Sequence, residues 1–243
     1  MKKIVLLIAF AFAVISCKHS ADDERIIPAA NLYSQGLTEI DKGYYKRAAG
    51  TFDKLYFQHP GNHITPYAEL IQAYSLYLDT KYEDAIDILD HFLKYHPMHE
   101  DASYAHYMIG MSYYMQICDV QRDQNFTLHA KQVFAHVVSM YPNTKYALDA
   151  KLKLDLVEDH LAGKELEIGR EYIRLKNPSA AINRYQAVVK HYSTTSHIQE
   201  ALYRLVEAYM MLGIDDQATK YAGILGHNYP DTDWYAMAYK LIH

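Results

Sequence analysis

The chain has 243 residues, half of them hydrophobic, and it carries 24 tyrosines against seven phenylalanines and one tryptophan. This length and apolar content exclude a globally disordered chain and suffice for a sizeable buried core. Ten glycines and seven prolines are too few for a many-turned β-sandwich, and the formal net charge of −5 argues against a nucleic-acid binder held by a basic field.

The chain begins with the pattern of a bacterial export signal. A basic Met1-Lys2-Lys3 start precedes an uncharged run over 4–14, which is too short for an ordinary transmembrane helix of about 20 residues. The run ends in Val14-Ile15-Ser16-Cys17, which resembles the lipobox of bacterial lipoproteins. This resemblance implies a signal peptide over 1–16, cleavage before Cys17, and covalent lipid on the Cys17 thiol and the new amino end.

The residues after the lipobox fit a membrane tether. Several acyl chains on one residue are what stable anchoring requires, and 17–28 is a polar segment that would hold a domain about 30 Å from the membrane. Cleavage removes two lysines and takes the formal net charge from −5 to −7. Lys18 is compatible with sorting to the outer membrane. The alternative is an ordinary secretory signal with a chance cysteine.

From residue 29 onward the chain repeats a pattern that is typical of paired helices. Four segments close on an aromatic-rich stretch and a proline, and an alanine stands twelve residues before each proline. A fifth copy has Ser193 in place of proline. Four residues after the alanine, one turn along the same helix face, stands Phe52, Leu89, Phe134, Tyr185 or Ala222. Proline ends each second helix because it cannot continue the hydrogen-bond ladder.

A small residue in the preceding helix completes the pattern. Gly36 and Gly169 lie twelve residues before the alanine of their repeats, and Gly110 lies twenty before, because the third repeat holds an insertion. We expect these glycines where a neighbouring helix passes close. A lone helix pair cannot bury its apolar face, whereas stacked pairs can. The sequence therefore predicts an all-α fold: an α-solenoid with a right-handed superhelix and a concave wall made of the first helices.

The order of small residue, tyrosine, alanine, aromatic residue and proline resembles the tetratricopeptide-repeat family, as in Gly169, Tyr172, Ala181 and Tyr185. We place a repeat domain over 29–243. Its five repeats span about 29–62, 66–99, 103–144, 162–195 and 199–232. The stretch 145–161 is expected to be helical and to extend into the next first helix, and the residues from Asp231 to His243 to form a C-terminal cap.

Two motifs and the lipobox carry a more specific resemblance. The motifs are Tyr141–Ala150, after the third repeat, and the fourth-repeat segment that runs from Glu165 through Gly169-Arg170-Glu171 to Ala181-Ile182-Asn183-Arg184. Together they resemble the ComL-like family, the repeat lipoproteins of the outer-membrane β-barrel assembly machine. The resemblance implies a non-enzymatic scaffold, anchored by lipid to the periplasmic face of a Gram-negative outer membrane. Its implied partners are the barrel-forming POTRA subunit, unfolded outer-membrane proteins with C-terminal signals, and other assembly lipoproteins.

The resemblance also assigns residues. Arg184 corresponds to the family arginine that pairs with an acidic residue of the last POTRA domain. Without the resemblance, Arg184 reads as a surface charge worth under about 1 kcal/mol. Gln121-Arg122-Asp123 corresponds to an Arg-Asp pair in the family's loop, but Gln121 replaces the usual Asp and Gln124 the usual Pro. The role of this loop therefore stays open.

Six tyrosines in repeats two and three form a candidate client-binding groove: Tyr67, Tyr74, Tyr77, Tyr104, Tyr107 and Tyr114. Tyr67 and Tyr104 occupy matching positions in neighbouring repeats, as do Tyr77 and Tyr114, so we expect them to line up across the concave wall. Their rings would stack on aromatic residues of an extended client, and their hydroxyls would bond its backbone. Packing between helices explains the same spacing, and both interpretations stay open.

The sequence offers no chemistry for an enzyme, and we expect no cofactor besides the lipid on Cys17. Prolines interrupt the pairs His59/His63 and His96/His99, so neither provides the zinc spacing of a continuous helix. Cys118 has no neighbouring histidine and reads as an inert thiol. No phosphate loop, nucleophile motif or nucleic-acid signature occurs. Two alternatives to the assembly role remain: another periplasmic repeat lipoprotein that coordinates peptidoglycan synthesis or envelope constriction, and a repeat domain of a cell-wall hydrolase.

Overall fold

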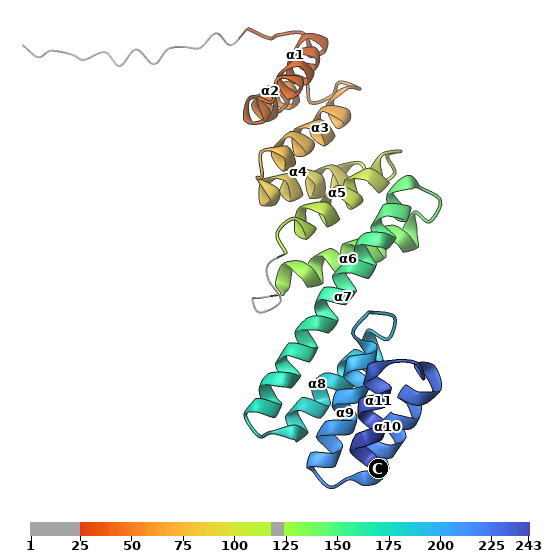
Figure 1. Cartoon of the computed structure of the whole chain (residues 1–243). Helices are drawn as coiled ribbons and strands as arrows, with labels where there is room; N and C mark the ends of the chain where they lie inside the picture. Colours follow the sequence, from red (N-terminus) through yellow and green to blue (C-terminus); the bar gives the residue numbers. More distant parts are fainter. Residues whose placement is uncertain (1–24, 118–123) are drawn as a thin grey trace, which may run out of the picture.

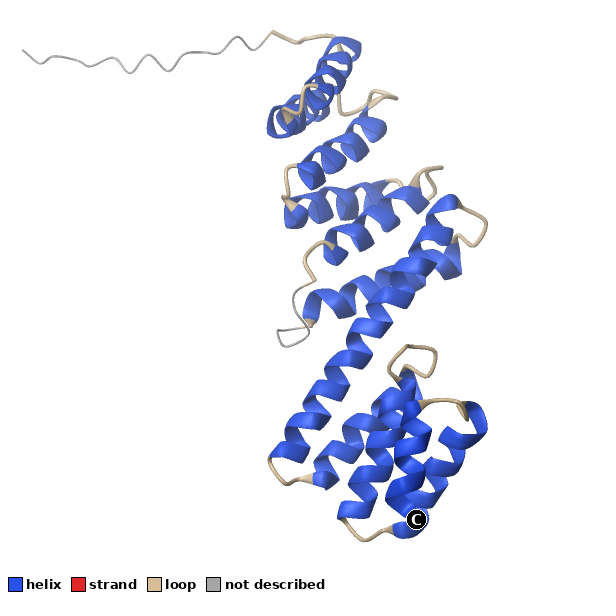
Figure 2. Cartoon of the chain, viewed as in Figure 1, coloured by secondary structure: helices blue, strands red, loops and turns tan. Residues whose placement is uncertain are grey.

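The computed structural model describes residues 25–117 and 124–243; the expected signal peptide, Cys17, Cys118 and the Gln121-Arg122-Asp123 loop lie outside them. Within the described residues every regular element is an α-helix (Figure 2). The helices are α1 Ala29–Asp41, α2 Tyr45–Gln58, α3 Thr65–Leu78, α4 Tyr82–Tyr95, α5 Ala102–Tyr114, α6 Asn125–Met140, α7 Lys145–Arg174, α8 Pro178–His191, α9 Ile198–Met211, α10 Asp215–Asn228 and α11 Asp233–Ile242. The expected all-α class is confirmed.

The helices stack as consecutive pairs, from α1 at one end of the molecule to α11 at the other (Figure 1). Each helix packs against the next along the chain, and α11 packs against both α9 and α10. The 30 residues of α7 form one helix that runs from the third pair to the fourth, which confirms the expected extension of 145–161. The handedness of the superhelix stays a prediction.

Within each of three pairs, the glycine of the first helix lies directly under an aromatic ring of the second. A Cβ atom at Gly36 would lie 2.5 Å from the ring of Phe52, and one at Gly110 would lie 2.6 Å from Phe134. Gly169 meets Tyr185 in the same way. All three rings are fully buried. The expected close approach at the glycines is confirmed, and the group that approaches is the aromatic residue of the same repeat.

The first helices of successive pairs form the inner wall of the stack. Helix α3 contacts α5, and α5 contacts α7, whereas the second helices α2, α4 and α6 share fewer contacts with one another. In a curved stack of equivalent units, the inner side is where equivalent helices approach most closely. Helices α3 and α5 and the start of α7 therefore line the concave side.

The core is divided into four hydrophobic clusters along the stack. One lies within α1 to α3, one within α3 to α5, one within α5 to α7, and the largest within α7 to α11. Tyr107 and Tyr113 pack against both the second and the third cluster and so join them. Among the described residues, no helix combines the length and apolar character needed to cross a membrane.

Candidate partner-binding surfaces

Four of the six predicted tyrosines, Tyr74, Tyr77, Tyr104 and Tyr107, come together on the inner wall. Burial raises the pKa of Tyr104, and the nearby hydroxyls of Tyr74, Tyr146 and Tyr77 raise it further. The Tyr104 ring centroid lies 5.4 Å from that of Tyr146 on α7. These four residues and Tyr146 form the tyrosine wall. It presents phenol groups from three successive first helices, α3, α5 and α7.

Tyr107 is held in place by α7. Its hydroxyl donates a hydrogen bond to Asp149 Oδ2 at 2.7 Å, and its ring centroid lies 5.4 Å from that of Tyr146. Burial and this hydrogen bond raise the pKa of Tyr107. Sequence reasoning missed Tyr146 as a member of the group because it follows the third repeat, although it stands inside the Tyr141–Ala150 motif.

Tyr67 has neighbours outside this group, whereas Tyr114 lies beside the same Phe134 ring as Tyr107, whose centroid is 6.3 Å from that ring. The Tyr67 hydroxyl donates to Glu100 Oε1 at 2.9 Å, which raises the Tyr67 pKa, and its ring lies 5.1 Å from that of His99. Tyr114 packs near the ring of Phe134, 6.2 Å away. Tyr67 and Tyr104 therefore have different neighbours in spite of their matching positions in the repeats.

Exposure divides the six tyrosines between packing and surface. Tyr67 and Tyr74 are 38% and 37% exposed. The other four are half-buried, and they pack against the second or third core cluster. Core packing thus accounts for the positions of four of the six tyrosines. The exposed rings of Tyr67 and Tyr74 leave a surface that a second polypeptide can reach.

Arg184 on α8 lies against α7. Its Nη1 atom is 3.3 Å from Glu165 Oε2, with the two side chains 42% and 23% exposed. The guanidinium has five N–H donors, of which this contact uses one. The remaining edge of the guanidinium is accessible to an acidic group from another chain. Glu165 belongs to the fourth-repeat motif, but nothing in the spacing marks it as the partner of Arg184.

A second charged cluster joins α7 to α9. Glu200 accepts from Arg170 Nη1 at 2.8 Å and from Arg204 Nε at 3.3 Å. Arg170 also pairs with Glu167, and Arg204 with Glu207. The side chains on the first helices thus differ along the stack: α3 and α5 carry phenol groups, whereas α7 and α9 carry alternating charges.

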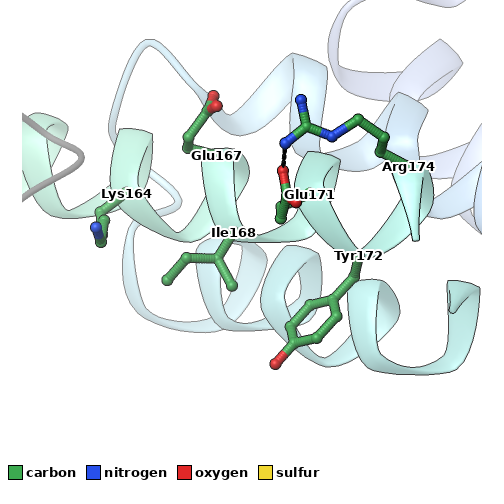
Figure 3. Close-up of a pocket in the computed structure, with 6 residues that line it drawn as sticks. All are labelled: Lys164, Glu167, Ile168, Glu171, Tyr172 and Arg174. Atoms are coloured by element: carbon green, nitrogen blue, oxygen red, sulfur yellow. Dashed lines mark hydrogen bonds and ion pairs between the residues drawn. The ribbon is translucent and has the colours of Figure 1, made fainter.

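An open hollow of about 570 Å³ lies beside this cluster on α7 (Figure 3). Its lining residues all come from about three turns of that helix, between Lys164 and Arg174. Glu171 and Arg174 form an ion pair at its edge. A hollow with one helical wall presents a surface to a partner but does not enclose a small molecule.

The histidine pairs noted in the sequence do not assemble a metal site. His59 Nε2 lies 2.6 Å from the carbonyl oxygen of Ile27, and the rings of His96 and His99 are 6.4 Å apart. Over 25–117 and 124–243, no group of three or more potential ligands among His, Cys, Asp and Glu gathers closely enough to hold a metal ion.

Similar proteins were found by sequence and by structure. The chain is 51% identical to the outer membrane protein assembly factor BamD of Rickettsia prowazekii, covering 99% of this chain and 96% of that protein. It is 38% identical to BamD of Caulobacter vibrioides, covering 98% and 80%. A thermophilic tetratricopeptide-repeat protein of Thermus thermophilus superposes with a TM-score of 0.42 at 17% identity, covering 88% and 99%. Because that score is below 0.5, the fold assignment rests on the helix pairing described above.

The family relationship spans the repeats and most of the described chain. Residues 26–224 match the family model YfiO, described as "Outer membrane lipoprotein". This range contains the tyrosine wall, the Arg184–Glu165 pair and the charged cluster of α7 and α9. The chain therefore belongs to the YfiO family of outer membrane lipoproteins.

Proposed function

We propose that this protein is a non-enzymatic assembly factor that scaffolds the folding and insertion of β-barrel proteins at the outer membrane. The observation that carries the proposal is the 51% identity, over 99% of the chain, to a protein named outer membrane protein assembly factor. A stack of helix pairs supports it, because such a stack offers long surfaces for other polypeptides. These relatives favour the assembly role over the peptidoglycan alternative.

The anchor is the first part of the proposal. The protein is associated with the outer membrane, and we place it on the periplasmic face, held by lipid on Cys17. The basic start, the apolar run and the lipobox support this placement. Cys17→Ala should leave an unprocessed precursor or release a soluble protein, as seen by fractionation and gel mobility. Membrane retention of mature-sized Cys17→Ala protein would reject the lipid anchor.

The barrel-forming POTRA subunit is the proposed partner of Arg184. The support is the exposed guanidinium edge on α8, which keeps free donors beside its contact with Glu165. An acidic group that docks there would remove the arginine from water. Losing one member of such a desolvated pair costs about 2–5 kcal/mol.

A pull-down from a Gram-negative envelope in mild detergent tests this partner. The native protein should recover a large POTRA-barrel protein, and Arg184→Glu should recover much less while keeping its helical spectrum. Lys190→Glu is the matched control, since it makes the same charge change on an exposed position of the same helix. Unchanged recovery with Arg184→Glu would remove the residue assignment. Recovery of peptidoglycan-synthesis proteins in place of a POTRA barrel would favour the alternative function.

Other assembly lipoproteins are proposed as further partners.

Unfolded outer-membrane proteins are the proposed clients of the tyrosine wall. Tyr74 supports the client surface because its ring is exposed beside the half-buried phenol of Tyr104. A peptide with a C-terminal aromatic residue should bind, and Tyr74→Ala should weaken binding without loss of stability. Tyr239→Ala, an exposed ring on α11, is the control. Equal peptide affinity in both variants would exclude Tyr74 from the client site.

A further inference from the structure

A pocket of about 400 Å³ lies between the α2–α3 turn and the end of α4, away from the tyrosine wall and from Arg184. The C-terminal ends of the second helices α2 and α4 form its sides, and Glu69 from the first turns of α3 lies at its base. None of the proposed surfaces above includes these residues. The pocket is therefore a separate candidate binding site.

Glu69 is a buried carboxylate that the chain leaves half-satisfied. Its side chain is 3% exposed, and its Oε1 atom lies 3.4 Å from His91 Nδ1. Its Oε2 atom has no hydrogen-bond partner among the described residues. A buried polar group without a partner is costly, and a buried charge more so. Burial raises the Glu69 pKa to about 7.

The chain treats another buried glutamate quite differently. Glu39 is 6% exposed, and its oxygens accept hydrogen bonds from Thr51 at 2.7 Å, Gln35 at 3.1 Å and Arg47 at 3.2 Å. Those hydrogen bonds outweigh burial and lower the Glu39 pKa. Within the fold, Glu39 is thus supplied with donors from its own chain, whereas Glu69, which lines the pocket, keeps one buried oxygen without a hydrogen-bond partner in the part of the chain that the structure describes.

Aromatic rings wall the cavity above Glu69. The ring of His91 lies 5.7 Å from that of Tyr56 and 4.5 Å from that of Tyr95, which is 60% exposed at the mouth. His96 also lines the cavity, and burial lowers its pKa, so it supplies no fixed positive charge. The α2–α3 turn adds Pro60, Gly61 and Asn62 and no ionisable group. Flat rings beside a carboxylate are the environment in which organic cations bind.

An acid stands at the Glu69 position in two of the repeats, and the two acids are partnered differently: Glu165, four residues before Gly169, pairs with the Arg184 guanidinium of its own chain. Glu69 stands four residues before Ala73, and the matching position four residues before Gly110 is His106. There His106 faces His136, with ring centroids 4.6 Å apart, and burial lowers the His106 pKa to about 4. The same place in the next repeat thus holds two facing imidazole rings in place of the carboxylate and its histidine. Where repeat four carries the acid, an arginine of the chain itself is the partner, whereas among the described residues no arginine or lysine lines the pocket beside Glu69.

We propose that the pocket binds the guanidinium of an arginine side chain presented by a partner polypeptide, with Glu69 as its counter-ion and Tyr56, His91 and Tyr95 as its ring walls. Arginine fits better than lysine because its planar fork can donate to the Glu69 carboxylate while its faces stack on rings. The proposal is independent of the assembly role and of Arg184, because it concerns different helices and an opposite charge.

The test uses the mature lipoprotein in mild detergent, with N-acetyl-arginine amide as the probe and the citrulline analogue as its uncharged match. Saturation-transfer NMR titrations follow both probes. The arginine probe should bind saturably and at least about tenfold more tightly than the citrulline probe. Glu69→Gln should remove this difference, whereas Glu100→Gln, an exposed carboxylate bonded to Tyr67, should preserve it. Binding should also weaken as the pH falls from about 8 to about 6, because the cation needs the ionised acid.

A second variant keeps the test decisive if Glu69→Gln does not fold. Tyr95→Ala removes an exposed ring, so the fold should persist, and arginine affinity should fall about two- to fivefold. Equal binding of the two probes by the native protein would overturn the proposal. Native arginine affinity in both Glu69→Gln and Tyr95→Ala, or a pH-independent affinity, would overturn it as well.

Discussion

Gly110 and Phe134 are in contact across the third helix pair so closely that a methyl group at Gly110 would lie 2.6 Å from the phenylalanine ring. The ring is fully buried, so it has no free space into which to withdraw. Gly36 with Phe52 and Gly169 with Tyr185 repeat the arrangement. In these three pairs the two helices are thus fixed at a distance that only glycine permits.

Gly110→Ala should therefore destabilise the protein. Overpacking of a core contact costs about 1–3 kcal/mol, which exceeds the gain in helix propensity from alanine. Urea unfolding followed by far-ultraviolet circular dichroism measures the change. Gly50→Ala is the control, since Gly50 lies within α2 with nothing within 4 Å of an added Cβ. That variant should be more stable by about 0.5–1 kcal/mol, and equal midpoints for the two variants would contradict the steric account.

Thr80→Gly should stabilise the protein by about 1 kcal/mol. Thr80 follows α3 with a φ of 60°, and the equivalent turns use Gly43 at 75° and Gly213 at 68°. This left-handed conformation is unfavourable for a residue with a Cβ, and β-branching adds to the strain. Thermal and urea unfolding measure the gain. Asp79→Gly is the control: Asp79 has a φ of −80°, so glycine there relieves nothing and should lower stability.

Acid should act on two titratable groups, the half-buried His106 and the buried Glu69, in opposite directions. His106 has a pKa lowered to about 4 from 6.5, so its contribution to stability is present above pH 6.5 and is lost as the pH falls through 4. Glu69 has a pKa raised to about 7 from 4.5, so its contribution is present below pH 4.5 and is lost as the pH rises through 7. The two effects partly cancel in the native protein between pH 4.5 and 6.5.

Single variants should separate these effects. On acidification the native protein should lose at most about 3 kcal/mol of stability through His106, and solvent screening reduces this loss. His106→Asn should remove the loss, so the free energy of unfolding should stay level or rise as the pH falls. Glu69→Gln should instead make the fall steeper. Free energies of unfolding measured across this pH range give both slopes. Parallel pH profiles for the native protein and both variants would show that neither group titrates as its surroundings indicate.

Arg184→Ala should change stability by less than about 1 kcal/mol. Its contact with Glu165 is long at 3.3 Å, and the arginine side chain is 42% exposed, so water screens the pair. The melting temperature and the helical spectrum should therefore stay close to those of the native protein. A large loss of stability would mean that Arg184 holds α7 to α8, and a reduced pull-down with Arg184→Glu would then say little about a partner.

Local signals in the sequence were enough for the helix pairs. The spacing of alanine, aromatic residue and proline specifies where each second helix begins to bury its face and where it ends, and the glycines specify the close contact within a pair. Phe134 meets Gly110 because both belong to one repeat, whose two helices are joined by a short connection or a bounded insertion. The lipobox and the family motifs are likewise continuous stretches, so a single chain reveals them without its fold.

Contacts between different helices were decided by the tertiary structure. Tyr146 joins Tyr104 and Tyr107 only because α7 continues from the third pair to the fourth, and the pocket above Glu69 exists only because α2 and α4 end on either side of α3. Such contacts depend on the angle at which one pair packs on the next. Many side chains in several helices set that angle together, and residue spacing along the chain does not contain it.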